Sequence, residues 1–233
     1  MKPVTLLAVA LLAAASGAAP AAALPSRHPD PSEFVAHVDN PWFPLRPYTT
    51  SVYRGVKDGQ PSRDVFRVTA KTKTIEGIRC TVVRDRLFLR GRLEERTEDW
   101  YAQDRDGNVW YFGEATAELR HDGSVETTEG SWQAGREGAI AGVFMPAHPH
   151  VGQSGRQELF AGHAEDRFRV LSLRAKVHTP AASSRHALLT REWTPLEPGV
   201  VDHKLYVKGI GNVLEKTVQG GDELNELVSI RRR

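Results

Sequence analysis

The chain has 233 residues, of which 31 are Lys or Arg and 29 are Asp or Glu, so its formal net charge is only +2 at pH 7. Hydrophobic residues make up 40% and charged residues 26%, as in ordinary globular proteins. The balanced charge excludes a dedicated nucleic-acid binder, which needs a strong basic excess. The single cysteine, Cys80, excludes an intramolecular disulfide.

Residues 1–23 predict a secretory signal peptide. Lys2 supplies a basic start, an apolar run extends from Val4 to about Ala15, and a tract of small residues ends at Ala23. This order of charge, apolar core and Ala-x-Ala is typical of secreted proteins. The apolar run is shorter than the ~20 residues that a membrane span needs. We therefore expect cleavage near Ala23 and a soluble extracytoplasmic protein without a transmembrane segment.

Residues 24–48 predict an extended proline-rich leader. They hold six prolines, a density that opposes helix formation. At their centre the segment 39–45, Asp-Asn-Pro-Trp-Phe-Pro-Leu, is too apolar to remain in water. We expect the leader to pack across the domain, with Trp42 as its anchor.

Residues 49–233 predict a single all-β domain. Short runs rich in β-branched and aromatic residues alternate with turn signals such as Asp-Gly, and no helical period is evident. The stretch 133–155, rich in Gly, Ala and Pro, is expected to be irregular. This pattern predicts one antiparallel twisted sheet curled into a barrel or half-barrel, or else a sandwich. The expected strands are 49–56, 64–72, 75–88, 93–103, 108–112, 156–160, 165–176, 188–193, 200–206, 211–218 and 223–231.

Aromatic residues are densest in the predicted hairpin 98–114. Pockets for small molecules are mostly apolar with a few placed polar groups, so tryptophans are candidate lining residues. The same side chains would also fill an ordinary core. The turn 104–108, Asp-Arg-Asp-Gly-Asn, matches a calcium loop only in part, because it lacks the distal glutamate. The candidate ligand-binding residues are Trp100, Trp110, Trp132 and Trp193.

Histidines cluster in the stretch 142–150, which resembles the opening of the first cupin motif, a glycine followed after five residues by His-x-His. His148 and His150 could form a metal site with His163 and Glu158, because imidazole and carboxylate suit Zn, Mn or Fe. The motif's glutamate comes too late here, and solvated loop histidines are the alternative. We expect no cofactor, with a divalent metal as the alternative.

Two carboxylates, Glu158 and Asp166, flank a predicted turn at 160–163, so they could face each other across two strands. Such pairs perform general acid–base catalysis when they are close and partly buried. Surface salt bridges to neighbouring arginines are the alternative. Since no Walker loop, G-x-G-x-x-G unit or H-E-x-x-H helix is present, nucleotide use and metalloprotease chemistry lose their usual support.

Several blocks resemble a family of uncharacterised secreted bacterial proteins, a resemblance that implies no particular activity. A second resemblance, to lipoprotein-carrier-like half-barrels of the cell envelope, rests on residues 206–213, Tyr-Val-Lys-Gly-Ile-Gly-Asn-Val. It implies a concave sheet that holds an apolar ligand. The blocks behind the first resemblance are Asp39–Leu45, Asp99–Asp104, Asn108–Glu114, Gln157–Glu158 with Gly162–Asp166, and Glu192–Gly199.

The leading hypothesis is a secreted protein that binds an apolar or lipid-like molecule on a concave β-sheet. One alternative is an extracellular hydrolase or metal-dependent enzyme that uses Glu158 and Asp166 or the three histidines. Another is a cell-envelope protein that binds a partner through an exposed edge strand. The sequence leaves open whether catalysis occurs, and it does not set the oligomeric state.

Overall fold

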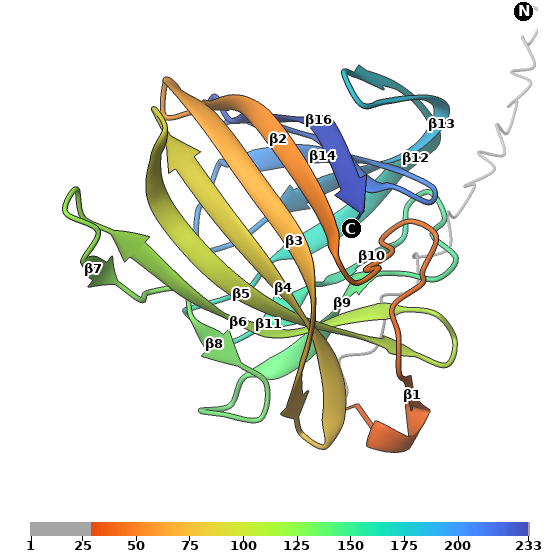
Figure 1. Ribbon diagram of the computed structural model, residues 1–233. Coiled ribbons are helices and arrows are strands. Elements are labelled where there is room, and N and C mark those ends of the chain that lie inside the picture. Colours follow the sequence, from red (N-terminus) through yellow and green to blue (C-terminus); the bar gives the residue numbers. More distant parts are fainter. Residues whose placement is uncertain (1–28, 233) are drawn as a thin grey trace, which may run out of the picture.

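The computed structural model describes residues 29–232, which form a nearly closed antiparallel β-barrel (Figure 1). Within that range, the short 3-10 helix η1 (Pro31–Glu33) is the only helical element. The structure confirms the all-β prediction and the barrel prediction. The predicted signal peptide lies outside the described residues. No helix within 29–232 is long and apolar enough to cross a bilayer.

Sixteen strands make up the sheet, and most are joined to their sequence neighbours by short turns. They are β1 (Phe34–Val35), β2 (Thr49–Lys57), β3 (Gln60–Ile75), β4 (Ile78–Leu89), β5 (Arg92–Asp104), β6 (Val109–Leu119), β7 (Val125–Thr127), β8 (Trp132–Gln133), β9 (Ile140–Met145), β10 (Ser154–Arg156), β11 (Glu158–Leu159), β12 (Arg167–Thr179), β13 (Ala182–Trp193), β14 (Val201–Val207), β15 (Gly211–Gln219) and β16 (Leu224–Arg232).

The barrel closes where the two ends of the strand order meet. The order runs β10-β12-β13-β14-β15-β16-β2-β3-β4-β5-β6-β9-β11, and its end strands β10 and β11 are consecutive in the chain. Only Gln157 separates them, and its backbone N–H donates to the Asp166 carbonyl oxygen at 2.8 Å. One continuous segment therefore pairs with β12 on one side and with β9 on the other.

Strand β9 lies in the stretch 133–155, which the sequence predicts to be irregular, so that expectation is wrong for these six residues. Gly142 suggests a loop in the sequence, but in the structure it allows two strands to pack closely. A Cβ atom at Gly142 would lie 2.5 Å from the Gln157 backbone, so only glycine allows β9 and the segment around β11 to approach. The stretch therefore completes the barrel wall.

The segment before β2 is buried against the barrel. Trp42, Phe43 and Leu45 are each at most 6% exposed and belong to the main hydrophobic core. Asn40 holds the segment in place: its side-chain N–H donates to the Gly107 carbonyl at 2.8 Å, and its side-chain oxygen accepts from the Trp42 N–H at 2.8 Å. This arrangement brings residues 43–45 to the interior of the barrel.

Candidate binding site inside the barrel

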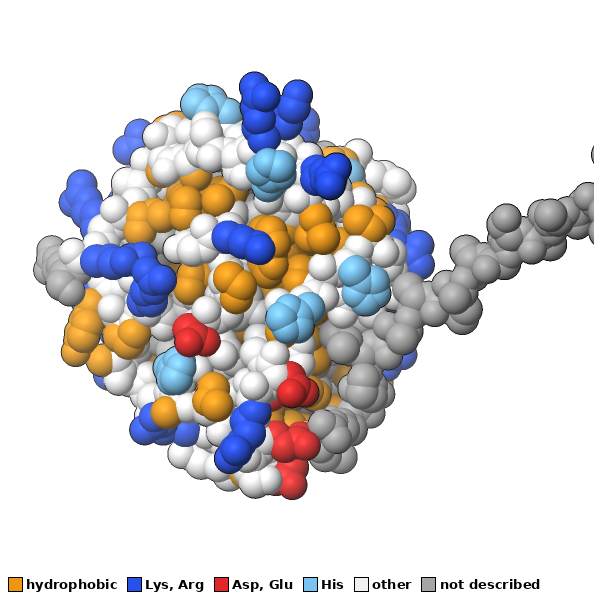
Figure 2. Space-filling model, turned by 90° about the vertical axis from the view of Figure 1, so that its right-hand side faces the viewer, with side chains coloured by type: hydrophobic (Ala, Val, Ile, Leu, Met, Phe, Trp, Pro, Cys, Tyr) orange, Lys and Arg blue, Asp and Glu red, His pale blue; other side chains and the backbone are white. Residues whose placement is uncertain are grey.

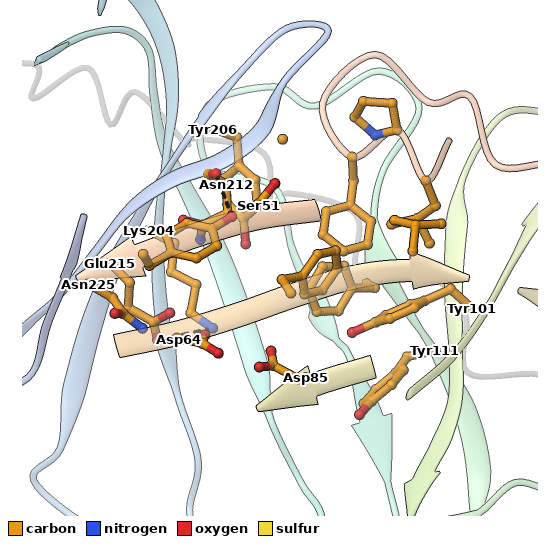
Figure 3. A pocket seen from close by; sticks show the side chains of 18 of the residues that line it. Ser51, Asp64, Asp85, Tyr101, Tyr111, Lys204, Tyr206, Asn212, Glu215 and Asn225 are labelled. Carbon is orange, nitrogen blue, oxygen red and sulfur yellow. Dashed lines mark hydrogen bonds and ion pairs between the residues drawn. The ribbon is translucent and has the colours of Figure 1, made fainter. Parts of the chain in front are cut away.

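A cavity of about 290 Å³ lies inside the barrel (Figure 3). Side chains alternate between the two faces of a strand, so every second residue of each strand points inward. Strands β2–β6, β9, β11 and β14–β16 all contribute lining residues, as does the segment 43–45. The cavity is thus built from distant parts of the chain that only barrel closure brings together.

One part of the cavity wall is aromatic. Tyr101 on β5 lies directly opposite Tyr111 on β6, and their rings stack with centroids 4.7 Å apart. The Phe144 ring meets the edge of Tyr101 at 5.2 Å, and Phe43 lies 4.6 Å from Phe144. Figure 3 shows the two tyrosines side by side. The Tyr111 hydroxyl donates to the buried Asp99 carboxylate at 2.8 Å, which fixes the ring.

The opposite part is polar and centres on Lys204. Its ammonium lies 3.3 Å from a Glu192 oxygen and 3.2 Å from a Glu215 oxygen. Burial alone would lower the pKa of Lys204, but the two glutamates hold it well above its ordinary value. Burial raises the pKa of Glu215 to about 7 in spite of the Lys204 charge. Lys204 therefore remains cationic and already has two carboxylate partners.

Between these parts lie two aspartates, Asp64 on β3 and Asp85 on β4, both turned into the cavity (Figure 3). Burial, and then the neighbouring Asp85 carboxyl, raise the pKa of Asp64 well above its ordinary value. Asp64 Oδ1 is buried without a hydrogen-bond partner within residues 29–232, as are Asn225 Oδ1 and Thr49 Oγ1, which line the same cavity. The Asp64 carboxyl still shares a side-chain hydrogen bond with Asp85. Buried polar atoms of this kind are satisfied in native proteins by water, an ion or a ligand.

The predicted pair Glu158 and Asp166 also lines the cavity, together with Glu114. Burial, and next the charge of Asp166, raise the pKa of Glu158 to about 8. Burial and Glu158 raise the pKa of Glu114 to about 8 as well. The pKa of Asp166 is raised by burial, although Lys204 opposes the shift. The three carboxyls therefore act on one another, and Glu114 and Glu158, whose pKa values are about 8, hold protons at neutral pH.

The lining has a large excess of hydrogen-bond acceptors. Among its described lining residues, Lys204 is the single basic one, against six acidic ones. The orphaned Asp64 and Asn225 oxygens add to this excess, because both accept hydrogen bonds. The arrangement suits a guest that brings N–H donors and positive charge. The acidic lining residues are Asp64, Asp85, Glu114, Glu158, Asp166 and Glu215.

The four candidate tryptophans lie outside the cavity lining. Trp100 and Trp110 are buried on the other face of the sheet from Tyr101 and Tyr111. The Lys73 ammonium lies 3.1 Å from the Trp100 ring centre, and the Trp110 N–H donates to Asp104 at 2.8 Å.

The other two tryptophans differ in burial. Trp132 lies directly opposite Glu114 across β6 and β8, and its ring packs at a right angle against that of Tyr111, with centroids 5.5 Å apart. Trp193 is half-buried and stacks under Arg191. None of the four tryptophans lines the described cavity directly. Their role in ligand binding remains a prediction.

The three candidate histidines are exposed. His163 stacks on Phe160 with ring centres 4.3 Å apart, while His148 and His150 lie in the loop that follows β9. On the face shown in Figure 2 the histidines stand as separate groups. Within the described range 29–232, no group of three or more His, Cys, Asp or Glu is arranged to hold a metal. The partial calcium loop is a turn in which Asp104 accepts from the Asn108 N–H at 2.8 Å.

Sequence reasoning missed most of the cavity, including Lys204, Asp64, Asp85 and the tyrosine pair. The sequence does contain one indication of a polar interior, because charged residues such as Asp64 and Asp85 interrupt runs of β-type residues. Asp64 lies two residues from Phe66 on β3, and Asp85 lies two residues from Val83 on β4. Because every second residue of a strand points to the same face, the apolar residues indicate that both aspartates point inward. A single sequence does not say which face is the interior when that interior is polar.

No protein-family model matches the chain, and no curated protein matches it. Among solved structures, a chain described as a "putative lipoprotein" from Parabacteroides distasonis ATCC 8503 is similar, with a TM-score of 0.43 and 9% sequence identity. The match covers 82% of this chain and 98% of that chain. We draw no functional argument from a likeness of this level. The resemblances based on sequence blocks remain predictions.

Proposed function

We propose that this is an extracytoplasmic binding protein whose barrel holds a compact organic cation with an apolar body. The observation that carries the proposal is a cavity with six carboxyl side chains against one ammonium. The buried Asp64 and Asn225 oxygens that lack partners within residues 29–232 support it further. An amine or guanidinium would donate to these oxygens and balance the excess acid.

The aromatic wall favours an apolar body on the same ligand. Tyr101, Tyr111 and Phe144 offer ring faces and edges, and cations and apolar groups both bind well against such surfaces. A volume of about 290 Å³ lies at the lower end of the range for small-molecule sites. It therefore favours a compact amphiphilic molecule over a lipid with long acyl chains.

Calorimetry with three ligands of one shape tests the charge requirement. The probes are 2-phenylethylammonium, its neutral isostere 2-phenylethanol and the anion phenylacetate. We expect the cation to bind at least about tenfold more tightly than the alcohol. Because the pKa of Glu114 and Glu158 is about 8, a cation must displace their protons at neutral pH. Its affinity should therefore rise between pH 6 and pH 9, with proton release.

The matched variants are Asp64→Asn in the cavity and Asp106→Asn in an exposed turn. We expect the first to weaken cation binding about tenfold and the second to leave it unchanged. Binding of the alcohol or of phenylacetate as tight as that of the cation would contradict the proposal, as would equal effects of the two variants.

A second candidate function is acid–base catalysis, favoured by the adjacent Glu158 and Asp166 carboxyls. A group whose pKa is about 8 still carries its proton at pH 7 and can deliver it to a leaving group. Turnover of chromogenic aryl esters or glycosides that is abolished in Glu158→Gln and kept in the exposed-site control Glu126→Gln, with both variants folded, would support it. A panel without turnover between pH 5 and pH 9 would leave the binding function as the better account.

A further inference from the structure

The outer face of β16, β2, β3 and β4 carries a second hollow, on the other side of the strands that bear Asp64 and Asp85. Its volume is about 490 Å³. None of its described lining residues is acidic, and half of them are arginines. We name this hollow the arginine groove after those residues, which are Arg54, Arg63, Arg67, Arg84, Arg86 and Arg231.

Strand register places these arginines directly against one another. Arg54 lies opposite Arg63 across β2 and β3, and Arg67 lies opposite Arg84 across β3 and β4. Like charges at opposed positions destabilise a strand pair. The arginine groove therefore carries an electrostatic cost that a bound anion would relieve.

Few internal partners offset this charge. Arg84 donates to Glu98 at 2.9 Å, and the Arg63 guanidinium lies 4.3 Å from the Phe88 ring centre. Arg54 faces Glu226 in register. Across residues 29–232, Arg84 is the only one of the six arginines with a carboxylate oxygen within 4.0 Å. Within the described part of the chain, the other five guanidinium groups form no ion pair, although Arg63 lies over the Phe88 ring.

The arginines are spread over the sheet and do not converge on one point. Arg63 and Arg67 are four residues apart on β3, a distance of ~13 Å along the strand. The row also crosses four adjacent strands, which are each separated by ~4.8 Å. A single phosphate or sulfate would reach only part of this area. A linear polymer with repeated anionic groups would reach all of it.

The remaining lining residues favour a carbohydrate polymer. Val52, Val65 and Val228 present apolar surface between the arginines, which suits the aliphatic faces of sugar rings. Tyr48 is the only aromatic residue among the described lining residues, so the arginine groove offers no run of stacking surfaces for nucleic-acid bases. Because the site is a hollow, it also fits a chain better than a flat membrane surface.

We propose that the arginine groove binds a linear anionic polysaccharide, through guanidinium contacts to sulfate, phosphate or carboxylate groups. Arginine suits these groups because its planar fork donates two parallel hydrogen bonds to an oxyanion. The proposal is independent of the barrel cavity, because the inner and outer faces of β2–β4 have different side chains.

Fluorescence anisotropy with a labelled heparin dodecasaccharide tests the site. We expect saturable binding that weakens at least about tenfold when NaCl rises from about 50 mM to about 200 mM. The variant Arg54→Gln/Arg67→Gln removes two guanidinium groups without touching the Glu98 or Phe88 contacts. At the lower salt concentration this variant should bind heparin about tenfold more weakly than the unmodified protein.

The control Arg174→Gln/Arg185→Gln makes the same charge change on exposed positions of β12 and β13 and should leave affinity within about twofold. Asp64→Asn should also leave it unchanged, which separates this site from the cavity. Equal losses in the two arginine variants would overturn the proposal, as would absence of heparin binding at low salt. Tighter binding to single-stranded DNA or to phosphatidylglycerol vesicles would overturn the choice of partner.

Discussion

The inner and outer faces of β3 and β4 carry opposite charges, although they are the two sides of one sheet. Arg63 points outward and its neighbour Asp64 points into the cavity, while Asp85 points inward between the outward Arg84 and Arg86. Consecutive residues thus place opposite charges on opposite faces of one sheet. The nearly neutral net charge of +2 therefore conceals an acidic interior behind a basic outer groove.

This difference shows that position, and not residue type, sets how a charge behaves. The inner carboxyls are surrounded by protein, so the pKa of Glu114 and that of Glu158 are both about 8. The outer guanidinium groups lie at the surface, where they meet solvent. Perturbing the inner face should therefore change stability and its pH dependence, whereas perturbing the outer face should change only interactions with other molecules.

The largest effect is expected from Lys204→Met, which removes the one cation among the described residues of the cavity lining. Glu192 and Glu215 would then lie beside each other without a counter-charge. Lys204 and Glu215 are partly exposed, so the cost should lie at the lower end of that for a buried ion pair, about 3 kcal/mol. Urea unfolding at pH 8 should report this loss in the free energy of unfolding, with a smaller loss at pH 5, where Glu215, whose pKa is about 7, takes up a proton.

Lys216→Met serves as the matched control, because Lys216 lies on β15 beside Glu215 and is exposed. It should change the free energy of unfolding by less than about 0.5 kcal/mol. Similar losses in the two lysine variants would contradict a special role for the interior cation.

The next effect is the pH dependence of the free energy of unfolding, which should amount to a few kcal/mol. Glu114, Glu158 and Glu215 have an ordinary pKa of 4.5, which burial raises to about 8, about 8 and about 7 in the folded protein. Between pH 4.5 and pH 8 the folded state therefore binds more protons than the unfolded state. The free energy of unfolding should fall as pH rises through this window and level off above it.

Urea titrations at several pH values measure that slope. Glu114→Gln/Glu158→Gln should remove much of it, since two of the three groups no longer titrate, whereas Glu126→Gln on the exposed β7 should leave it unchanged. A free energy of unfolding that rises steadily from pH 5 to pH 8 would show that the interior carboxyls are ionised in the folded protein.

A smaller effect is expected from the two stacked tyrosines. Tyr111→Phe removes the hydroxyl that donates to buried Asp99, so that carboxyl loses a partner, at a cost of about 1–2 kcal/mol. Tyr101→Phe leaves the same ring stack and removes no hydrogen bond to Asp99, so it should cost less than about 0.5 kcal/mol. Thermal unfolding of both variants makes the comparison, and equal costs would show that the Asp99 bond contributes nothing.

Much of the fold could be predicted because turns and alternation are local properties. The hairpin turn at Asp104–Gly107 and the strands on either side of it follow from Asp-Gly and from β-branched and aromatic runs. Strand β9 could not be predicted, since Gly142 looks like a loop residue until its close approach to Gln157 is known. Closure of a barrel depends on such contacts between distant residues.

The cavity was less predictable than the strands, because it too depends on contacts between distant residues. Glu158 and Asp166 drew attention because they lie close in sequence, and they do line one cavity. Lys204 and Asp64 are 140 residues apart, and only the strand order brings them together. The sequence predicts four tryptophans as lining residues, but the described cavity lining contains none of them and only Trp132 packs against a lining tyrosine. An aromatic residue suits either side of a buried strand, so its presence alone does not identify the face of the cavity.

The smallest effect on stability is expected from Arg67→Gln in the arginine groove, the outer counterpart of Asp64. Arg67 lies opposite Arg84, and no carboxylate oxygen of residues 29–232 lies within 4.0 Å of it, so its removal relieves repulsion and breaks no ion pair. The free energy of unfolding should change by less than about 0.5 kcal/mol, with a slight gain at low salt that screening removes. Urea unfolding at low and high NaCl checks this. A clear loss of stability would mean that the guanidinium supports the sheet itself, and the outer arginines would then belong to the fold rather than to recognition.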